Sequence, residues 1–175
     1  MITVIVGTNR INSRARHIAD LYIELLRKLN AECQLLDLAL LPADVSVSAL
    51  YDNTGNHAGF NELAALASTA DKLVVVVPEY NCSYPGVLKT FIDGLPYPGG
   101  IRGKKAALIG LSSGGQGGLL ALSHLSDVLM YLGTAVLPAR VRLPFIDKHL
   151  SEAGTLDNAL YQHLLEEQAQ QLLAF

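Results

Sequence analysis

The segment PEYNCSYPGVLKTFID, Pro78 to Asp93, holds the polar residues of this chain that are best placed to bind a ligand. It follows the apolar run Leu73–Val77, which has the composition of a buried strand. Pro78 ends this strand, because proline has no N–H to give to a sheet. We expect an exposed polar loop next, and then a helix that begins near Ser83–Pro85. Open α/β sheets bind ligands in such loops, at the carboxyl ends of their strands.

The side chains of this first loop offer both donors and acceptors. Tyr80 and Asn81 are free to meet a ligand, and Glu79 either accepts hydrogen bonds or is solvated. Ser83 is a suitable cap for the helix that follows. Cys82 is either a reactive thiol or an inert packed one, and the inert interpretation is favoured because no base lies beside it in sequence.

A second polar loop, GTNRINSRARHIA from Gly7 to Ala19, follows the apolar run Ile2–Val6. It contains no acid, and the free backbone N–H groups of a helix start point the same way as its side chains. These features predict an anion site, for which a phosphate dianion is the natural occupant. The alternative is an N-capped helix with solvated arginines. The polar side chains concerned are Thr8, Arg10, Asn12, Ser13, Arg14 and Arg16.

A third loop, SSGGQGG at Ser112–Gly118, follows the apolar run Ala106–Leu111. Its four glycines within five positions let the backbone approach a flat ligand closely, although a flexible turn is the alternative. Gln116 adds a donor and an acceptor. Because the carboxyl ends of parallel strands meet at one edge of a sheet, the three loops can converge on one crevice.

Short β-rich runs alternate with helical patterns along the chain, which predicts an α/β fold with a parallel sheet covered on both faces. We expect strands at Ile2–Val6, Cys33–Leu36, Lys72–Val77, Ala106–Leu111 and Thr134–Leu137. Apolar stripes predict helices around Ile18–Leu29, Phe60–Ala70, Tyr84–Gly94, Leu119–Leu132 and Tyr161–Leu172. The connection Asp37–Asn56 is long for an α/β unit, and we expect it to cover the site or to lie in an interface.

The composition excludes several classes of protein. A length of 175 residues fits a single domain, 1–175. Cys33 and Cys82 are too few for a disulfide framework, which favours a reducing cytoplasm. A formal net charge of −3, without a basic patch or acidic tail, argues against binding to nucleic acid or a membrane surface. No apolar stretch approaches the roughly 18 residues of a membrane span, and we expect no signal peptide.

The residues of acid–base or metal catalysis do not form a recognisable pattern. No Cys/His cluster has the spacing of a metal site, and no GxSxG motif frames a serine. The five histidines are scattered, which favours surface or packing roles. A bound cofactor that carries its own chemistry explains this absence.

The three loops together resemble those of the NADPH-dependent FMN reductase family, a flavodoxin-like group that includes quinone, azo-dye and chromate reductases. The resemblance rests on GTNR–S, PEYNCSYPGVLKTFID and GKKAALIGLSSGGQGG, and it covers roughly Met1 to Leu137. It implies a flavodoxin-like three-layer sandwich with a five-stranded parallel sheet in the order 2-1-3-4-5. It also implies that FMN lies over the carboxyl ends of the strands, at the switch point between strands one and three.

The resemblance assigns roles to individual residues. The family usually reads G-S-x-R-x-x-S-x-N in its phosphate loop; here Thr8 replaces the first serine, and Ala15 lacks the side chain of the asparagine. Arg14 or Arg16 is a candidate to replace that asparagine. The residues implied to hold the FMN phosphate are Thr8, Arg10 and Ser13. Those implied to line the isoalloxazine ring and ribityl chain are Pro78, Glu79, Tyr80, Asn81 and Ser83. Those implied to lie along the pyrimidine edge are Ser113, Gly114, Gly115 and Gln116.

The implied activity is a two-step exchange. NADPH or NADH passes hydride to the flavin, and a quinone, azo compound, metal oxyanion or free flavin then takes the electrons. No side chain acts as a nucleophile, and the backbone of Gly114 and Gly115 supports the reduced flavin. The resemblance also implies a homodimer or homotetramer. Gly94 stands where many relatives carry Trp, on a helix that relatives often use for dimer contacts.

Three alternatives remain from the sequence. The first is a flavodoxin-type electron carrier without its own NAD(P)H turnover; such carriers tend to be strongly acidic, and a net charge of −3 argues against one only weakly. The second is a non-redox nucleotide or phosphate hydrolase on the same fold, for which no base or metal site is found. The third is a scaffold or regulatory protein that binds FMN without turnover.

Overall fold

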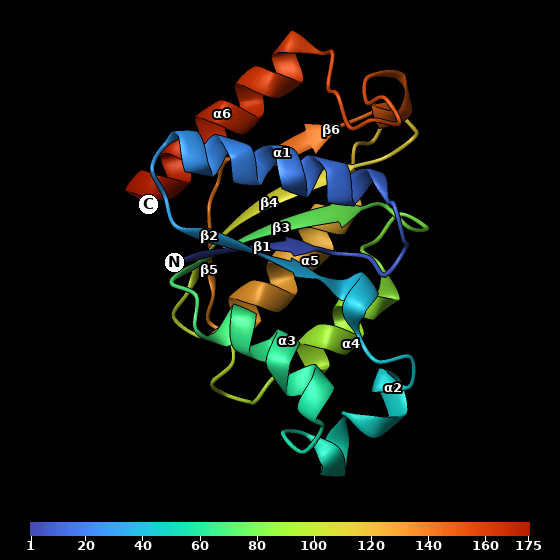
Figure 1. Cartoon of the computed structure of the whole chain (residues 1–175), viewed down its shortest axis with the longest axis vertical. Helices are drawn as coiled ribbons and strands as arrows, with labels where there is room; N and C mark the ends of the chain where they lie inside the picture. Colours follow the sequence, from blue (N-terminus) through green and yellow to red (C-terminus); the bar gives the residue numbers. More distant parts are fainter.

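The computed structural model describes residues 1–175, and at its centre a parallel β-sheet lies between two layers of helices (Figure 1). The strands are β1 (Ile2–Val6), β2 (Cys33–Asp37), β3 (Lys72–Pro78), β4 (Lys105–Leu111), β5 (Ala135–Val136) and β6 (Val141–Leu143). Their order is β2-β1-β3-β4-β5, with every pairing parallel. The predicted flavodoxin-like order 2-1-3-4-5 is therefore confirmed.

The fifth position of the sheet is divided into two short strands, where the sequence pattern predicts one strand at Thr134–Leu137. β5 pairs with the first residues of β4, and β6 pairs with its last three. Pro138 lies between the two pieces and interrupts the ladder, because it has no N–H. The side-chain amide of Gln168 fills the gap by donating to the carbonyl oxygens of Leu108 (3.0 Å) and Ala139 (2.6 Å). The broken strand therefore keeps its place at the edge of the sheet.

Helices cover both faces of the sheet. They are α1 (Arg14–Lys28), α2 (Val45–Ser48), α3 (Ala58–Ser68), α4 (Gly86–Gly94), α5 (Leu119–Tyr131) and α6 (Ala159–Ala174). Figure 1 shows α1 and α6 on one face, and α3, α4 and α5 on the other. None of these helices combines the length and the apolar character that a membrane crossing requires.

The two faces of the sheet carry separate apolar cores. Val4 and Val74 point into the core beneath α1 and α6. Their chain neighbours Ile5 and Val75 point into the core beneath α3, α4 and α5, because side chains alternate along a strand. Each such fully buried side chain contributes about 1.5–3 kcal/mol, and burial on both faces explains why β1 and β3 are almost wholly apolar.

The predicted helices are present, with differences at their ends. The helix predicted over Tyr84–Gly94 begins at Gly86, after Pro85 as its N-cap. Leu29 was predicted on the apolar stripe of the first helix, but it is exposed because it is the C-cap of α1. Leu119 is also exposed, because it lies at the start of α5 before its buried face begins.

The long connection Asp37–Asn56 folds into short helical turns. Two 3₁₀ turns, Leu38–Leu40 and Tyr51–Asn53, flank α2. Leu38 and Val45 are buried in the same core as α3 and α4. The connection therefore extends that core, and none of its residues lines the cavity described below.

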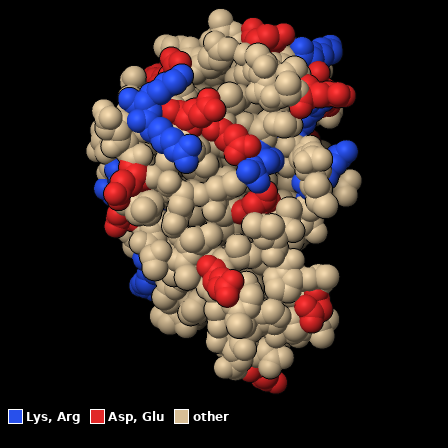
Figure 2. All heavy atoms as spheres, in the orientation of Figure 1, with Lys and Arg blue, Asp and Glu red and all other residues tan.

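Charged side chains are mixed on the surface. In Figure 2, basic and acidic side chains are interspersed over α1 and α6, and the region of α2 and α3 shows only scattered acids. The view shows no large patch of one sign.

Candidate functional site

The carboxyl ends of β1, β3 and β4 border a cavity of about 730 Å³. Its walls come from the loops after these strands and from the segment after β6. This volume lies in the range of about 300–1,000 Å³ that is typical of small-molecule and cofactor sites. Half of the predicted site residues line the cavity, namely Arg10, Ser13, Pro78, Glu79, Tyr80 and Ser113. The fold thus brings the three predicted loops together.

The other predicted site residues surround the cavity without lining it. Thr8 is fully buried below it. Asn81 is exposed on a turn farther out, and Ser83 is half-buried on the same turn. The residues Gly114, Gly115 and Gln116 are exposed on the glycine-rich loop. The contacts that all these residues make with a ligand stay predictions.

The start of α1 is built as a donor site. Ser13 is the N-cap, and its Oγ accepts a hydrogen bond of 3.1 Å from the backbone N–H of Arg16. The expected N-cap is therefore present, but Arg14 and Arg16 are hydrogen-bonded within the chain and not simply solvated. The cap leaves the Ser13 O–H free to donate to a ligand. The backbone N–H groups of Asn12, Ser13, Arg14 and Ala15 have no partner within the chain. These groups, together with the helix dipole, favour an anion at this point.

The arginines of this loop have different roles. The guanidinium group of Arg16 donates to Asp20 at 3.0 Å and to Asp37 at 2.9 Å, and this side chain does not line the cavity. Arg16 is therefore not placed to replace the missing asparagine of the family motif. The guanidinium group of Arg10 is exposed at the cavity and makes no hydrogen bond or ion pair within the chain. Arg10 is the cation available to a phosphate.

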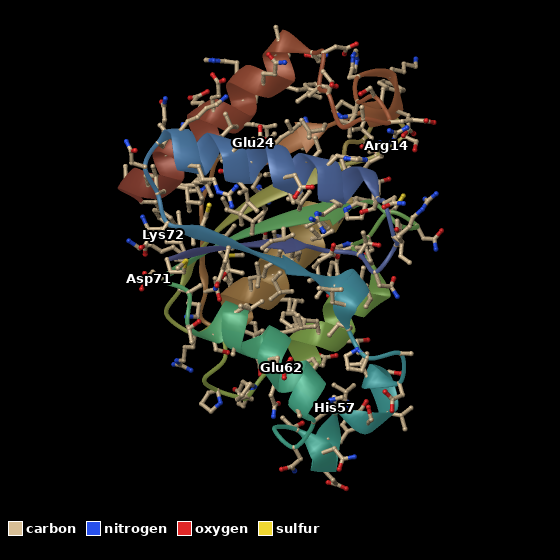
Figure 3. All side chains as sticks on the ribbon, in the orientation of Figure 1. Arg14, Glu24, His57, Glu62, Asp71 and Lys72 are labelled. Atoms are coloured by element: carbon tan, nitrogen blue, oxygen red, sulfur yellow. The ribbon has the colours of Figure 1, made fainter.

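Arg14 lines the cavity but is held by the segment after β6 (Figure 3). Its Nε donates to the carboxylate of Asp147 at 3.1 Å, and its Nη1 donates to the carbonyl oxygens of Leu150 and Ser151, each at 3.1 Å. Of the two arginines considered as substitutes for the asparagine, only Arg14 reaches the cavity.

Asp147 is a cavity residue that the sequence analysis missed. A hydrogen bond from Ser113 is the main cause that lowers the pKa of this carboxyl, and Arg14 lowers it further. Ile146 and Glu152 line the same wall. No local motif marks these residues, and only the path of the chain after β6 places them beside the loops of β1 and β4.

The segment Tyr80–Ser83 forms a tight turn. Tyr80 and Ser83 exchange backbone hydrogen bonds of 2.8 and 3.0 Å. The two central residues, Asn81 and Cys82, have φ values of 51° and 58°. Positive φ at both positions is typical of a type I′ turn, which asparagine tolerates well. This turn places the Tyr80 side chain on the cavity wall.

The prediction that Ser83 caps the next helix is wrong. The N-cap of α4 is Pro85, which makes no side-chain cap bond. Because Ser83 is paired with Tyr80 in the turn, its side chain points elsewhere and lies 3.0 Å from Nδ1 of His124 on α5.

The glycine-rich loop presents a row of unpaired donors. Ser112 Oγ holds the two ends of this loop together. It donates to the carbonyl of Gly114 and accepts from the Gly117 N–H, each at 2.8 Å. The N–H groups of the four residues from Ser113 to Gln116 have no partner within the chain. A Cβ built on Gly114 meets no atom within 4 Å, so the surface of the loop is open. Successive free N–H groups of this kind favour a ligand edge that carries negative charge.

The donor groups fit FMN. A phosphate dianion matches Arg10, Ser13 and the start of α1, and a flat ring with carbonyl edges matches the open N–H groups of the glycine-rich loop. No group of three or more His, Cys, Asp or Glu side chains is arranged to hold a metal ion.

Sequence comparison identifies relatives over most of the chain. Residues 1–146 match the family model described as NADPH-dependent FMN reductase. The 2-hydroxy-1,4-benzoquinone reductase of a Burkholderia species is 45% identical over 71 residues, which are 39% of each protein. The quinone reductase of Escherichia coli is 37% identical over 112 residues, 63% of this chain and 57% of that protein. These two alignments span less than two thirds of the relatives' own length. An NAD(P)H-dependent FMN reductase of Pseudomonas aeruginosa is 31% identical over 137 residues, 74% of each.

Solved structures share the fold. The flavoenzyme NAD(P)H:(acceptor) oxidoreductase FerB from Paracoccus denitrificans superimposes with a TM-score of 0.81 and 25% identity, covering 99% of this chain and 94% of that one. The apo form of the NADH:FMN oxidoreductase EMOB has a TM-score of 0.74 at 22% identity, covering 99% and 89%, and shows the common fold alone. The match over residues 1–146 decides the assignment: the chain belongs to the NADPH-dependent FMN reductase family.

Proposed function

We propose that this chain is an FMN-dependent NAD(P)H oxidoreductase. One observation carries the proposal: a single cavity at the carboxyl ends of the strands gathers an unpaired arginine and a helix start, and it lies beside a glycine-rich loop whose N–H groups are free. Bound FMN supplies the chemistry, because it takes hydride from a nicotinamide dinucleotide and passes the electrons to a small acceptor.

The loop after β1 holds the phosphate. Arg10 supplies the positive charge, Ser13 donates its O–H, and the N–H groups at the start of α1 complete the cradle. Arg14 stays fixed by Asp147 and stiffens the wall. This division leaves Arg10 as the side chain that neutralises the phosphate.

The loops after β3 and β4 hold the ring. The backbone N–H groups of Gly114 and Gly115 have no partner within the chain, so they would be free to stabilise the edge of the ring that becomes electron-rich. Tyr80, at the start of the turn after β3, lines the cavity and would shield one side of the ring from water. No side chain of the cavity acts as a nucleophile in this proposal.

A quinone is the acceptor that the relatives favour, since two of them are named as benzoquinone and quinone reductases. An FMN-dependent NADPH-azoreductase of Staphylococcus aureus, 27% identical over 160 residues, keeps azo compounds among the candidate acceptors. Metal oxyanions and free flavin are candidates from the family resemblance alone. The test is kcat/KM at fixed NADPH for benzoquinone, an azo dye, chromate and free FMN. We expect benzoquinone to rank first, and a higher value for any other acceptor would contradict the assignment.

A flavodoxin-type carrier is the rival within the same fold. Such a carrier holds FMN but does not oxidise nicotinamide dinucleotides by itself. Oxidation of NADPH or NADH by the purified protein with benzoquinone would exclude a pure carrier. Absence of turnover with both dinucleotides would favour it.

We also propose that the chain works in the cytoplasm as a homodimer or homotetramer. An apolar hollow of about 450 Å³ lies between α4, α5 and the segment that joins α4 to β4. Tyr97 and Tyr131 beside it are 72% and 80% exposed. Large exposed aromatic side chains around an apolar hollow suit a contact with a second copy. A monomer mass by light scattering at micromolar concentration would contradict this assembly.

A further inference from the structure

The side chain of Glu79 connects two of the loops around the cavity. Its Oε2 accepts a hydrogen bond of 2.9 Å from the backbone N–H of Gly118, the residue that precedes α5. The backbone N–H of Glu79 also donates to the carbonyl of Leu111, at 2.9 Å. The backbone of Glu79 therefore ties the loop after β3 to the end of β4, and its side chain ties the same loop to the loop after β4.

Helix α5 has no cap of its own. Its N-cap is Gly118, which has no side chain, and its first turn contains no acidic residue. The first N–H groups of a helix need acceptors, and a negative charge stabilises that end of the helix. Gly118 is buried, so its N–H cannot turn to water instead. The carboxylate of Glu79 supplies both the acceptor and the charge from a different element.

The backbone around Gly118 does not accept a residue that could cap the helix locally. Gly118 has φ of +82°, and a Cβ there would lie 2.8 Å from Cα of Gly110. Gly117 has φ of +59°, and its Cβ would lie 2.9 Å from Cδ of Pro144. Glycine is therefore required at both positions, and glycine loses more conformational freedom on ordering than any other residue. An external tie offsets that loss.

We propose that Glu79 is a positioning residue for the reaction at this site. By holding Gly118, it keeps the free N–H groups of Ser113 to Gln116 aligned before any ligand binds. This inference rests on the proposed function, which places FMN against that loop. Without the tie, the loop has to be ordered when FMN binds, and this entropy cost weakens the affinity.

The test compares Glu79→Ala, Glu79→Gln and Glu62→Ala with the parent protein. Glu62 is an exposed residue of α3 that makes no hydrogen bond, and it serves as the control (Figure 3). Two quantities are measured: exchange of the Gly118 amide hydrogen in the FMN-free protein by NMR, and the dissociation constant of FMN. We expect Glu79→Ala to speed the exchange and to weaken FMN, each by about tenfold, the scale of one lost charge-assisted hydrogen bond.

Glu79→Gln keeps a carbonyl acceptor, so we expect smaller changes, of about threefold, because a neutral hydrogen bond is weaker than a charged one. Unchanged exchange and unchanged FMN affinity in Glu79→Ala would overturn the proposal. Weaker FMN with unchanged exchange would also overturn it, because Glu79 would then act on the ligand directly. If Glu79→Ala does not fold, Glu79→Gln decides alone: unchanged exchange in that variant contradicts the tie.

Failure of the proposed function gives a different result. A parent protein that takes up no FMN refutes the function, whereas the exchange measurement needs no FMN and still tests the tie between Glu79 and Gly118. If the parent binds FMN and Glu79→Ala changes neither the Gly118 exchange nor the FMN affinity, only the role of Glu79 is refuted.

Discussion

The hydroxyl group of Thr8 lies 2.8 Å from that of Tyr80, and this hydrogen bond joins the loop after β1 to the loop after β3. Thr8 is fully buried, whereas Tyr80 is 37% exposed and lines the cavity. Thr8 therefore supports Tyr80 from below. Its direct contact with a phosphate stays a prediction, but its part in assembling the site follows from this bond.

The bond between Thr8 and Tyr80 predicts energetic coupling between two distant positions in the chain. We expect a double-mutant cycle with Thr8→Val and Tyr80→Phe to give a coupling energy of about 1 kcal/mol, because a part-buried hydrogen bond is lost only once. The measurement is urea denaturation of the FMN-free protein. Tyr97→Phe, at an exposed tyrosine without a hydrogen bond, is the control. Additive effects of the two site variants would show that the bond does not contribute.

The unpaired guanidinium group of Arg10 leads to a prediction about the strength of FMN binding. Arg10→Ala is expected to weaken FMN binding by about 1–3 kcal/mol, the scale of a hydrogen bond to a charged group, and to reduce the dependence of binding on salt. Arg27→Ala, at an exposed arginine in the last turn of α1, is the matched control. FMN titrations across a salt series measure both quantities. An Arg10→Ala protein that binds FMN as tightly as the parent at every salt concentration would refute the assignment.

Alanine substitutions at two glycines of the same loop are expected to have opposite effects on protein stability and on FMN binding. A Cβ at Gly114 meets open space, so Gly114→Ala is expected to change the free energy of unfolding by less than about 0.5 kcal/mol while weakening FMN. Gly118→Ala requires a positive φ and meets backbone at 2.8 Å, so a loss of about 2 kcal/mol or more is expected. Thermal and chemical denaturation without FMN, followed by FMN titration, separate the two effects. Equal stabilities of the two variants would contradict the loop geometry.

The lowered pKa of Asp147 implies that the stability of the protein depends on pH. The hydrogen bond from Ser113, and then Arg14, lower its pKa below the ordinary value of 3.8. A carboxyl group of this kind contributes its full stabilisation above the ordinary value and loses it as the pH falls through the lowered value. Asp147→Asn is therefore expected to cost at most about 1 kcal/mol at pH 7, because the side chain is half exposed, and much less near pH 3.

Urea denaturation of Asp147→Asn and the parent at several pH values makes this comparison. Asp52→Asn serves as the control, because Asp52 is exposed and makes no ion pair. A difference between Asp147→Asn and the parent that stays constant down to pH 3 would show that the charge of Asp147 is not what stabilises the fold.

Most of the fold follows from the pattern of apolar residues. β1 was predicted with its observed bounds, and β2, β3 and β4 each within one residue at an end. The fifth strand was harder to predict, because Pro138 divides it and Val141–Leu143 is too short to show an alternating pattern. The Gln168 side chain on α6 bridges the break, and a local sequence pattern does not contain this long-range contact.

The site was predictable where it depends on loops next to strands, and not where distant segments meet. Arg10 and Ser13 could be placed at the cavity from the motif around them. Asp147 could not, because it reaches the cavity only after the chain has completed the sheet. The Ser83 cap failed for a different reason: the positive φ values at Asn81 and Cys82 close a turn that no glycine marks in the sequence.

The most direct test of the central claim is the visible absorption spectrum of the FMN-loaded protein under anaerobic conditions, before and after NADPH and then benzoquinone. The account predicts that the flavin band bleaches on NADPH and returns when benzoquinone is added. A bound flavin that neither NADPH nor NADH bleaches would contradict the proposed reductase and favour a carrier. A protein that takes up no FMN would contradict the assignment of the cavity itself.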